Sequence, residues 1–250
     1  MSGERTYILG VPVDPLTTEE VHVAVEERLA SRQPLQIATV NAEFVMRAQC
    51  DPEFRSVLER VDIATADGAG ILWALRRRGV RLHARVGGSD LIWSIAEICE
   101  RRHARVFLLG GSAGIAEAAA RRLTNRYPKL AIAGTFAGSP AAGEVLHIVD
   151  LVRRSRTDVL FVAFGAPAQD IWIARHFASA GVIVGMGVGG SFDYLAGAAQ
   201  RAPAWMQQHS LEWLWRLVRQ PRRWRRMLAL PHFAWLVWRE PATQGGKTST

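Results

Sequence analysis

The sequence predicts an α/β protein in which a mostly parallel, Rossmann-like sheet is flanked by helices. Short runs rich in β-branched and apolar residues alternate with runs of helical periodicity. The strand-like runs are apolar throughout, which is typical of parallel strands covered by helices on both faces. Apolar residues make up 49% of the 250 residues, enough to build a large core. These three observations define the expected fold class.

The expected elements follow one another regularly up to about residue 190. Strands are expected at 7–11, 35–40, 61–66, 105–110, 130–136, 158–164 and 181–188. Helical patterns between them cover 18–31, 43–60, 71–78, 90–102, 115–127, 143–154 and 169–178. From about residue 203 the chain is helical, rich in Trp and Arg, and interrupted by Pro221 and Pro231. We therefore expect an α/β domain over 1–200, a helical appendage over 201–240 and a disordered tail over 241–250.

The positive charge is concentrated near the C-terminal end. The formal net charge is +8, and residues 201–250 hold nine of the 31 Lys and Arg but only two of the 23 Asp and Glu. Such a local excess predicts a negatively charged partner: nucleic acid, anionic lipid or a phosphorylated ligand. The longest apolar stretch, 227–238, is shorter than the ~20 residues of a membrane span. With no signal-peptide pattern and two cysteines that look like reduced thiols, the sequence indicates a cytoplasmic protein.

The candidate ligand site lies where the strands end. Open α/β sheets bind ligands beyond the carboxyl ends of their strands. Glycines and small polar groups are frequent at these positions in the chain. The candidates are Thr39, Asn41, Asp67, Arg85, Gly110, Gly111, Gly165, Gln169, Gly187, Gly189 and Asp193.

Asp67 has two interpretations. It follows a buried-type strand and precedes Gly68 and Gly70, so it could cap the next helix through backbone N–H groups. Alternatively, it is a carboxylate held rigidly at a strand end, where it could act as a general base. The adjacent glycines would let a substrate approach closely.

The glycine-rich turns are also open to two interpretations. The GGSAG turn at 110–114 could bind a phosphate through backbone N–H groups or could be a plain tight turn. It does not match the dinucleotide fingerprint, and no acid follows the next strand, which argues against a nicotinamide cofactor. Asp193, in GVGGSFDYLAG, could cap a turn or bind a sugar hydroxyl. No Asp-x-Asp pair is present, and neither a cofactor nor a metal ion is expected.

The stretch LEWLWRLVRQPRRWRR at 211–226 combines six arginines with three tryptophans and one acid. Arg222 and Arg226, four residues apart on a helix, would converge on one face. A solvated basic face or an oligomer contact would explain them simply. However, Arg suits phosphate oxygens, and Trp favours the membrane–water interface. We therefore expect this region to rest on an anionic membrane and to reach a diphosphate.

The chain resembles the WecG/TagA/CpsF family of bacterial glycosyltransferases, glycosyltransferase family 26, from about residue 7 to residue 240. The matching segments keep their order and spacing along the chain. They are Thr39-Val40-Asn41, Asp67-Gly68, the segment from Arg85 to Asp90, Phe164 to Pro167 with Gln169, Gly187 to Gly190 with Phe192-Asp193, Arg201-Ala202-Pro203, Leu211 to Arg216 and Pro221-Arg222-Arg223. There are two departures: Ala168-Gln169-Asp170 stands where the family usually has Lys-Gln-Glu, and Ser210 where a Gly is common.

The resemblance implies a GT-E-like fold and an inverting transferase. The reaction would move a sugar (N-acetylmannosamine, its uronic acid or glucose) from a UDP-sugar onto a polyprenyl-diphosphate-linked saccharide. It would take place at the inner face of the cell membrane, in cell-surface polysaccharide synthesis. Asp67 would be the base, and Thr39, Asn41, Arg85 and Gln169 would line the pocket.

The resemblance also implies that Arg216, Arg223 and Arg226 swing over the site and hold the diphosphate. Arginines would then neutralise the leaving group without a metal ion. On this view, cutting the chain near Ala204 should leave a folded α/β core that has lost liposome affinity and most activity.

Two other classes of function remain open from the residues alone. One is an α/β nucleotide-binding oxidoreductase or hydrolase. The other is a non-enzymatic module that binds anionic lipid or nucleic acid through its basic end. Because indoles and an aliphatic run suit a membrane interface better than a DNA groove, we expect no nucleic-acid partner. A homo-oligomer is compatible with the sequence.

Overall fold

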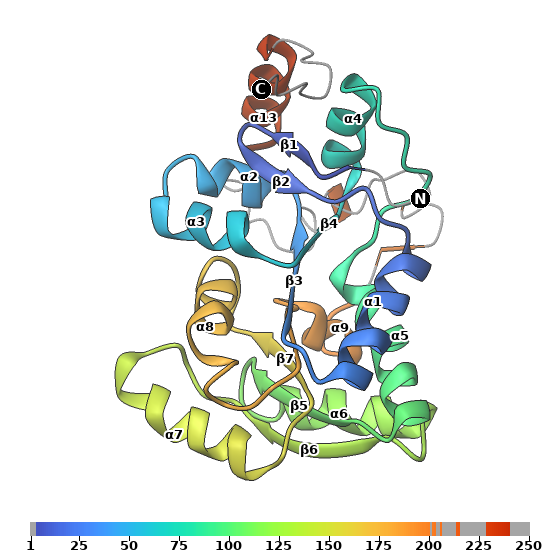
Figure 1. Cartoon of the computed structure of the whole chain (residues 1–250), viewed down its shortest axis with the longest axis vertical. Helices are drawn as coiled ribbons and strands as arrows, with labels where there is room; N and C mark the ends of the chain where they lie inside the picture. The colour runs from blue at the N-terminus through green and yellow to red at the C-terminus, as the bar shows by residue number, and fades with distance from the viewer. Residues whose placement is uncertain (1–3, 201, 204–205, 207–213, 216–228, 241–250) are drawn as a thin grey trace.

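The computed structural model describes residues 4–200, 202–203, 206, 214–215 and 229–240. Within this part, six strands form one parallel sheet with helices on both faces (Figure 1). The strands are β3 (Leu35–Val40), β4 (Ile63–Ala66), β5 (Arg105–Gly110), β6 (Ala131–Phe136), β7 (Val159–Ala163) and β8 (Val184–Gly187). Their order across the sheet is β4-β3-β8-β7-β5-β6. The predicted fold class is therefore confirmed.

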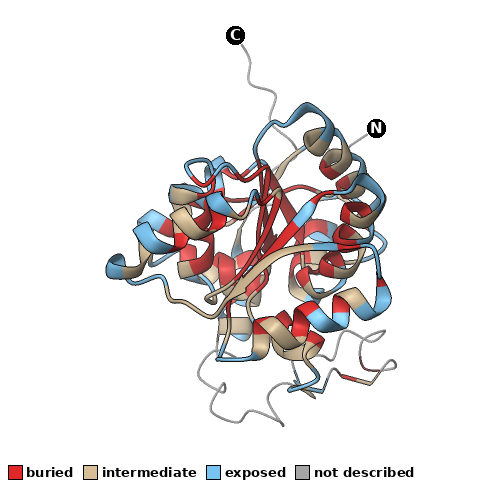
Figure 2. Ribbon diagram, turned by 90° about the horizontal axis from the view of Figure 1, so that it is seen from below, coloured by how far each residue is buried: buried red, intermediate tan, exposed pale blue. Residues whose placement is uncertain are grey.

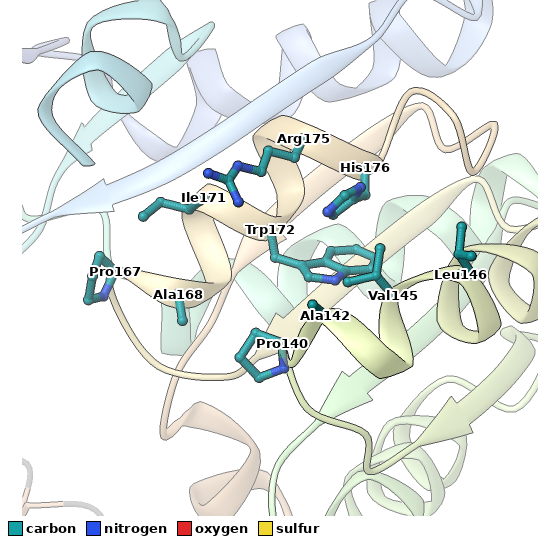
Figure 3. A pocket seen from close by; sticks show the side chains of 10 residues that line it. All are labelled: Pro140, Ala142, Val145, Leu146, Pro167, Ala168, Ile171, Trp172, Arg175 and His176. Atoms are coloured by element: carbon teal, nitrogen blue, oxygen red, sulfur yellow. The ribbon is translucent and has the colours of Figure 1, made fainter. Parts of the chain in front are cut away.

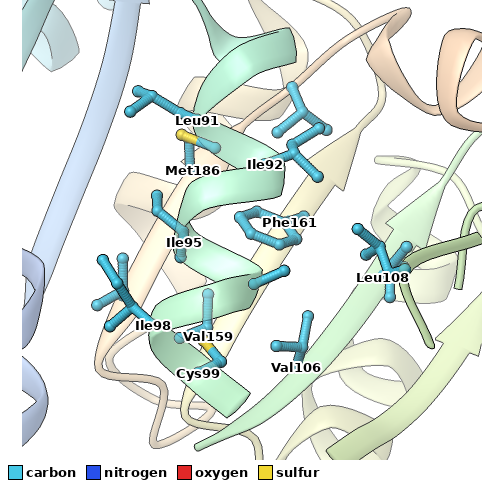
Figure 4. Close-up of a cluster of buried hydrophobic side chains, with 14 of the residues drawn as sticks. Leu91, Ile92, Ile95, Ile98, Cys99, Val106, Leu108, Val159, Phe161 and Met186 are labelled. Carbon is cyan, nitrogen blue, oxygen red and sulfur yellow. The ribbon is translucent and has the colours of Figure 1, made fainter. Parts of the chain in front are cut away.

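One face of the sheet is covered by four helices. They are α1 (Thr18–Ser31), α5 (Gly88–Arg102), α6 (Ile115–Arg126) and α9 (Ser191–Leu195). Successive strand residues point to opposite faces, so Ile37, Phe161 and Met186 lie on this side in one row. Figure 4 shows Ile95 and other apolar side chains of α5 packed over this row.

The opposite face is covered in two halves. The helices α2 (Ala42–Ala48) and α3 (Pro52–Arg60) pack beside β3 and β4, together with α4 (Ala69–Arg77) and α13 (Ala229–Arg239). The helices α7 (Ala142–Arg154) and α8 (Ala168–His176) cover β5 and β7. The sheet thus forms a buried central layer between two helical layers (Figure 2).

The strand order creates a switch point between β3 and β8. These strands are neighbours, but β3 leads into α2 on one face and β8 leads into α9 on the other. The two connections therefore diverge and leave a crevice at the carboxyl ends of the strands. Such crevices are where open α/β sheets bind their ligands.

Two expected elements differ from the structure. The predicted strand at 7–11 is instead a hairpin of β1 (Thr6–Ile8) and β2 (Val11–Val13), separate from the main sheet. Its turn, Leu9-Gly10, has positive φ at both residues, as a tight two-residue hairpin turn requires. The predicted helix at 43–60 is divided into α2 and α3. Asp51 caps α3 by accepting from Phe54 N (3.0 Å), and Pro52 occupies its first turn, where a proline starts a new helix.

The last described helix, α13, is packed into the core. Phe233 and Val237 are almost fully buried in the apolar cluster that includes Ala42 and Ile71. The helix α13 falls within the predicted appendage at 201–240, and its apolar face packs into this cluster. No helix in the described ranges is both long and apolar enough to span a membrane.

Candidate active site

A polar cavity of about 220 Å³ opens at the switch point. Its walls come from the ends of β3 and β8 and from the segments that follow β4 and β7. Eight of the predicted residues line it together: Thr39, Asn41, Asp67, Gly165, Gln169, Gly187, Gly189 and Asp193. Residues more than 150 positions apart in sequence therefore meet in one place.

Asp67 and Arg85 form an ion pair at the edge of this cavity. The distance from Arg85 Nη1 to Asp67 Oδ1 is 3.3 Å, and Arg85 Nη2 lies 3.4 Å from Asp90 Oδ2. Hydrogen bonds fix the loop that carries Arg85, because Val86 N donates to Ala66 O (2.9 Å) and Thr65 Oγ1 donates to Val86 O (2.9 Å). The guanidinium favours the ionised carboxylate, which is the form that can accept a proton.

The helix-cap interpretation of Asp67 is not supported. Gly68, and not Asp67, occupies the N-cap position of α4, and this helix has no side-chain cap. Gly68 has a φ of +92°, a conformation that glycine adopts without strain. The Asp67 carboxylate is directed to Arg85 and the cavity instead.

The first turn of α5 also faces the cavity. Gly88 and Ser89 line it, and the N-cap residue, Gly87, provides no side-chain hydrogen bond to the helix end. A Cβ atom on Gly88 would lie 3.3 Å from Thr39 Oγ1, so glycine brings the helix close to the end of β3. The N-terminus of a 15-residue helix directs its backbone N–H groups and positive dipole end toward an anion. From the sequence, the turn at 110–114 could either bind a phosphate in this way or be a plain tight turn.

Gln169 joins the two glycine-rich segments of the cavity. Its Oε1 accepts from Gly165 N (3.1 Å) and from Gly189 N (2.9 Å). The side chain is buried, with 3% exposed. Gln169 therefore fixes the segments after β7 and β8 relative to each other, in addition to lining the cavity.

Asn41 both caps a helix and lines the cavity. Its Oδ1 accepts from Phe44 N (3.0 Å) and caps α2, while the residue also lines the cavity. Asp193 lies on α9 and also lines the cavity. Several lining residues were not among the candidates: Glu43, Phe44, Ser89, Ala166, Ser191 and Tyr194. Ser89 and Ser191 are hydrogen-bonded at 3.0 Å, which links α5 to α9; only tertiary structure brings them together.

Two of the predicted glycines lie away from the cavity. Gly110 and Gly111 are not among the lining residues; a Cβ atom on Gly110 would lie 2.9 Å from the Ala163 backbone, and one on Gly111 would press on Ile115. Both have positive φ, so backbone conformation and packing explain these two glycines. Arg216, Arg223 and Arg226 lie outside the described residues, so their contact with a diphosphate stays a prediction.

A second, more apolar cavity lies between α7 and α8 (Figure 3). It has a volume of about 600 Å³, and its lining includes Val145, Trp172 and His176. The two cavities are lined by consecutive residues after β7: Gly165 and Ala166 line the polar cavity, and Pro167 lines the apolar one. The lining residues of the apolar cavity include no carboxylate and none of the predicted site residues.

A polar cavity at the switch point of a parallel sheet, with a carboxylate beside a guanidinium, is the arrangement of an α/β enzyme site. The model of the glycosyl transferase WecG/TagA/CpsF family matches residues 6–247. A relative from Bacillus subtilis (strain 168) is 32% identical over 204 residues, covering 82% of this chain and 79% of its own. One from Staphylococcus aureus (strain MW2) is 30% identical over 235 residues, covering 93% and 92%.

Both relatives are named N-acetylglucosaminyldiphosphoundecaprenol N-acetyl-beta-D-mannosaminyltransferase. The chain belongs to the WecG/TagA/CpsF family and is a glycosyltransferase. The predicted resemblance is confirmed. The family assignment also decides against the oxidoreductase, hydrolase and non-enzymatic alternatives.

Proposed function

We propose that this chain transfers an N-acetylmannosamine unit from a UDP-sugar to N-acetylglucosaminyl-diphosphoundecaprenol, with inversion at the transferred carbon. The family and the activity for which the relatives are named support the choice of sugar and acceptor. The observation that carries the mechanism is the position of Asp67, a strand-end carboxylate inside the cavity and 3.3 Å from Arg85.

In this mechanism Asp67 is the general base. Its carboxylate accepts the proton of the acceptor hydroxyl as that oxygen bonds to the anomeric carbon of the donor. The bond between this carbon and the β-phosphate oxygen breaks at the same time, and UDP leaves with the electron pair. Because the attacking and leaving oxygens lie on opposite sides of the carbon, the configuration is inverted.

The departing diphosphate requires positive potential. We assign this role to the N-terminus of α5 at Gly88 and Ser89, together with Arg216, Arg223 and Arg226 from the C-terminal segment. Thr39 and Asn41 would contact the sugar, and Asp193 would accept from one of its hydroxyls. Gln169 would act by holding Gly165 and Gly189 in place. In this scheme these groups neutralise the charge of the departing UDP without a metal ion.

The membrane contact is assigned to α13 and α4, which form an aromatic and basic face. Trp235 and Trp238 are 49% and 65% exposed, which is unusual for large apolar side chains. Arg239 lies over the Trp235 ring at 4.6 Å, and Arg77 over the Trp73 ring at 5.6 Å. Neither helix contains Asp or Glu. Arginine and exposed indole together suit an anionic bilayer surface.

The opposite, buried side of α13 packs near the chain segment that carries Asp67. A Cβ atom on Gly70, three residues after Asp67, would lie 3.4 Å from the Phe233 ring of α13. A protein resting on the bilayer through α13 and α4 would therefore hold its cavity close to the lipid head groups, where the acceptor diphosphate is found. We accordingly place the protein at the inner face of the cell membrane as a peripheral protein.

The proposed function is tested with a panel of donors. UDP-N-acetylmannosamine, its uronic acid, UDP-glucose and UDP-N-acetylglucosamine are each incubated with a short-chain polyprenyl-diphosphate N-acetylglucosamine. The products are scored by mass, with and without a chelator. We expect a product only from UDP-N-acetylmannosamine, and equal rates with the chelator. A different preferred donor would reassign the sugar, and loss of activity with the chelator would overturn the metal-free scheme.

Asp67→Asn tests the base. Removing a general base typically costs ~10²–10⁴-fold in rate, so kcat should fall by that range while the KM of the donor changes little. Asp193→Asn is the matched control, because it removes another carboxylate that lines the same cavity. We expect it to raise the donor KM with a smaller effect on kcat. Undiminished turnover by a folded Asp67→Asn variant would refute the assignment.

A further inference from the structure

Asp170 is a buried carboxyl group directly beneath the cavity. It follows Gln169 in the first turn of α8, and none of its surface is exposed. Neither of its carboxylate oxygens has a hydrogen-bond partner of good geometry among the described residues. Burial raises the pKa of this carboxyl to about 7, and the neighbouring Gln169 side chain and the Asp170 backbone N–H offset only part of that effect. Burying an ionisable group without hydrogen-bond partners destabilises the fold, and such groups are often found at functional sites.

Among the residues that the structure describes, the elements packed against α8 offer Asp170 no counter-charge. The strands that pack against α8, β3 (LQIATV), β7 (VLFVA) and β8 (VGMG), contain no ionisable residue. The charged side chains of the neighbouring helix α3 are Glu53, Arg55, Glu59 and Arg60, and those of α8 itself are Arg175 and His176. Glu53 is paired with Arg175, and Arg55 with Glu59, all at least partly exposed. Gln36 Nε2 of β3 donates to the backbone O of Asp170 (3.0 Å), and the polar side chain next to the Asp170 carboxyl is the Gln169 amide.

Gly187 brings these two side chains together under the cavity floor. A Cβ atom at Gly187 would lie 2.6 Å from Gln169 Nε2 and 2.9 Å from Asp170 Oδ1. Both polar atoms thus point to the space that the missing side chain leaves, and Gly187 itself lines the cavity. The Gln169 amide nitrogen faces this space, whereas its oxygen accepts from Gly165 N and Gly189 N.

The orientation of this amide is important for the site. With the oxygen toward the two glycines, both backbone N–H groups are satisfied. A flipped amide would direct its NH₂ group at those two donors and lose both bonds. An ionised carboxyl next to the amide nitrogen favours the observed orientation, since it can only accept. A protonated carboxyl could instead donate to the amide oxygen and compete with the glycines.

We propose that Asp170 is a positioning residue: its carboxylate faces the amide nitrogen of Gln169 and thereby keeps the amide oxygen on the segments that follow β7 and β8. Asp170 does not touch the reacting atoms. It acts through Gln169 on the shape of the wall that receives the donor. The inference rests on the proposed transfer reaction for its effect on activity, but not for its effect on stability.

Burial of this carboxyl makes the stability of the protein depend on pH. Between the usual Asp value of 3.8 and about 7, the folded protein holds a proton on Asp170 that the unfolded chain has lost. Stability therefore falls as pH rises through this window and levels off above it. Activity should change in the opposite direction, because the ionised carboxylate is the form that orients the amide.

Asp170→Asn separates positioning from simple packing. We expect wild-type kcat/KM to rise through pH 7, and the variant to lack this rise and be about tenfold less active at pH 8. Its Tm at pH 8 should nevertheless be higher than that of the wild type. Asp14→Asn is the control, because the buried Asp14 is paired with Arg5 and accepts from Ala64 N. That variant should lose stability at pH 8.

A second readout does not depend on activity. In protein labelled with ¹³C at the Asp carboxyls, one resonance should titrate near pH 7 and be absent from Asp170→Asn. If that resonance is found but no donor supports transfer, the proposed function fails and the buried titration stands. If the variant is less stable at pH 8, or keeps the same pH profile, Asp170 is a packing residue and the positioning proposal is overturned.

Discussion

At the scale of single residues, one missing side chain allows the proposed base and its partner to meet. Gly87 precedes α5, and a Cβ atom there would lie 2.9 Å from Asp67 Oδ1 and would also collide with the Arg85 guanidinium. Its φ of −99° is open to any residue, so the need for glycine here comes from space and not from backbone conformation. The ion pair of Asp67 and Arg85 thus depends on a residue that takes no part in the chemistry.

Gly87→Ala should therefore damage the site and leave the fold intact. The added methyl group would displace Arg85 from Asp67, and we expect kcat to fall at least tenfold with little change in Tm. Gly143→Ala is the matched control: Gly143 is an exposed residue in α7 with nothing within 4 Å of its Cβ position. Alanine there should raise helix stability by about 0.5–1 kcal/mol. Steady-state kinetics and thermal unfolding of both variants test this prediction. An unchanged kcat of Gly87→Ala would contradict it.

At the scale of elements, α13 has two different faces. Phe233 and Val237 point into the core, and Trp235 and Trp238 point to solvent. The helix is tied to its neighbours by polar contacts as well: Arg77 Nη2 donates to Trp238 O (3.2 Å), and Arg78 pairs with Glu240. A helix fixed in this way presents its indoles on a rigid support, which lowers the entropic cost of binding a surface.

Replacing both exposed indoles with serine should weaken membrane binding. We expect Trp235→Ser with Trp238→Ser to reduce affinity for phosphatidylglycerol vesicles at least tenfold, as measured by sedimentation. Activity on a short-chain, water-soluble acceptor should be unchanged. Leu146→Ser is the control, because Leu146 is 84% exposed on α7, which lies at the opposite end of the molecule from α13 (Figure 1). Equal loss in both variants would show that the effect is not specific to α13.

At the scale of the whole molecule, the apolar cluster around β3 and β4 is completed by residues from both ends of the chain. The hairpin near the N-terminus contributes Ile8 and Val11, and α13 contributes Phe233. Figure 1 shows α13, β1 and α4 grouped at the same end of the molecule. The α/β core is therefore not closed at residue 200.

Truncation after residue 228 should consequently destabilise the core. Removing Phe233 alone from a packed interior would typically cost about 3–5 kcal/mol, and the truncation also removes Val237. This prediction differs from the expectation that a cut near Ala204 leaves a folded α/β core, and the experiment below tests the two against each other. The control is truncation after residue 240, which keeps α13. Denaturant unfolding should show a lower midpoint only for the shorter chain; equal midpoints would mean that α13 contributes little to the fold.

The order of the elements could be predicted from the sequence because periodicity is a local property. The apolar runs at 35–40 and 105–110 coincide with β3 and β5, and the helical pattern at 18–31 coincides with α1. Two elements were predicted incorrectly because local turn residues interrupt them. Leu9-Gly10 folds the first expected strand into a hairpin, and Asp51-Pro52 starts a new helix within the second expected helix. The strand-end rule also selected eight of the cavity residues, because parallel strands end at one edge.

The sequence by itself determined the parallel α/β class, the identity of the strand-end groups and, through its motifs, the family. Only the tertiary structure decided that Arg85 meets Asp67, that Ser89 meets Ser191, and that Gln169 joins two glycine-rich segments. It also decided that Asp170 lies buried below them. The physical reason is the same in each case: strand order and helix packing fix which distant residues become neighbours, and no local pattern contains that information.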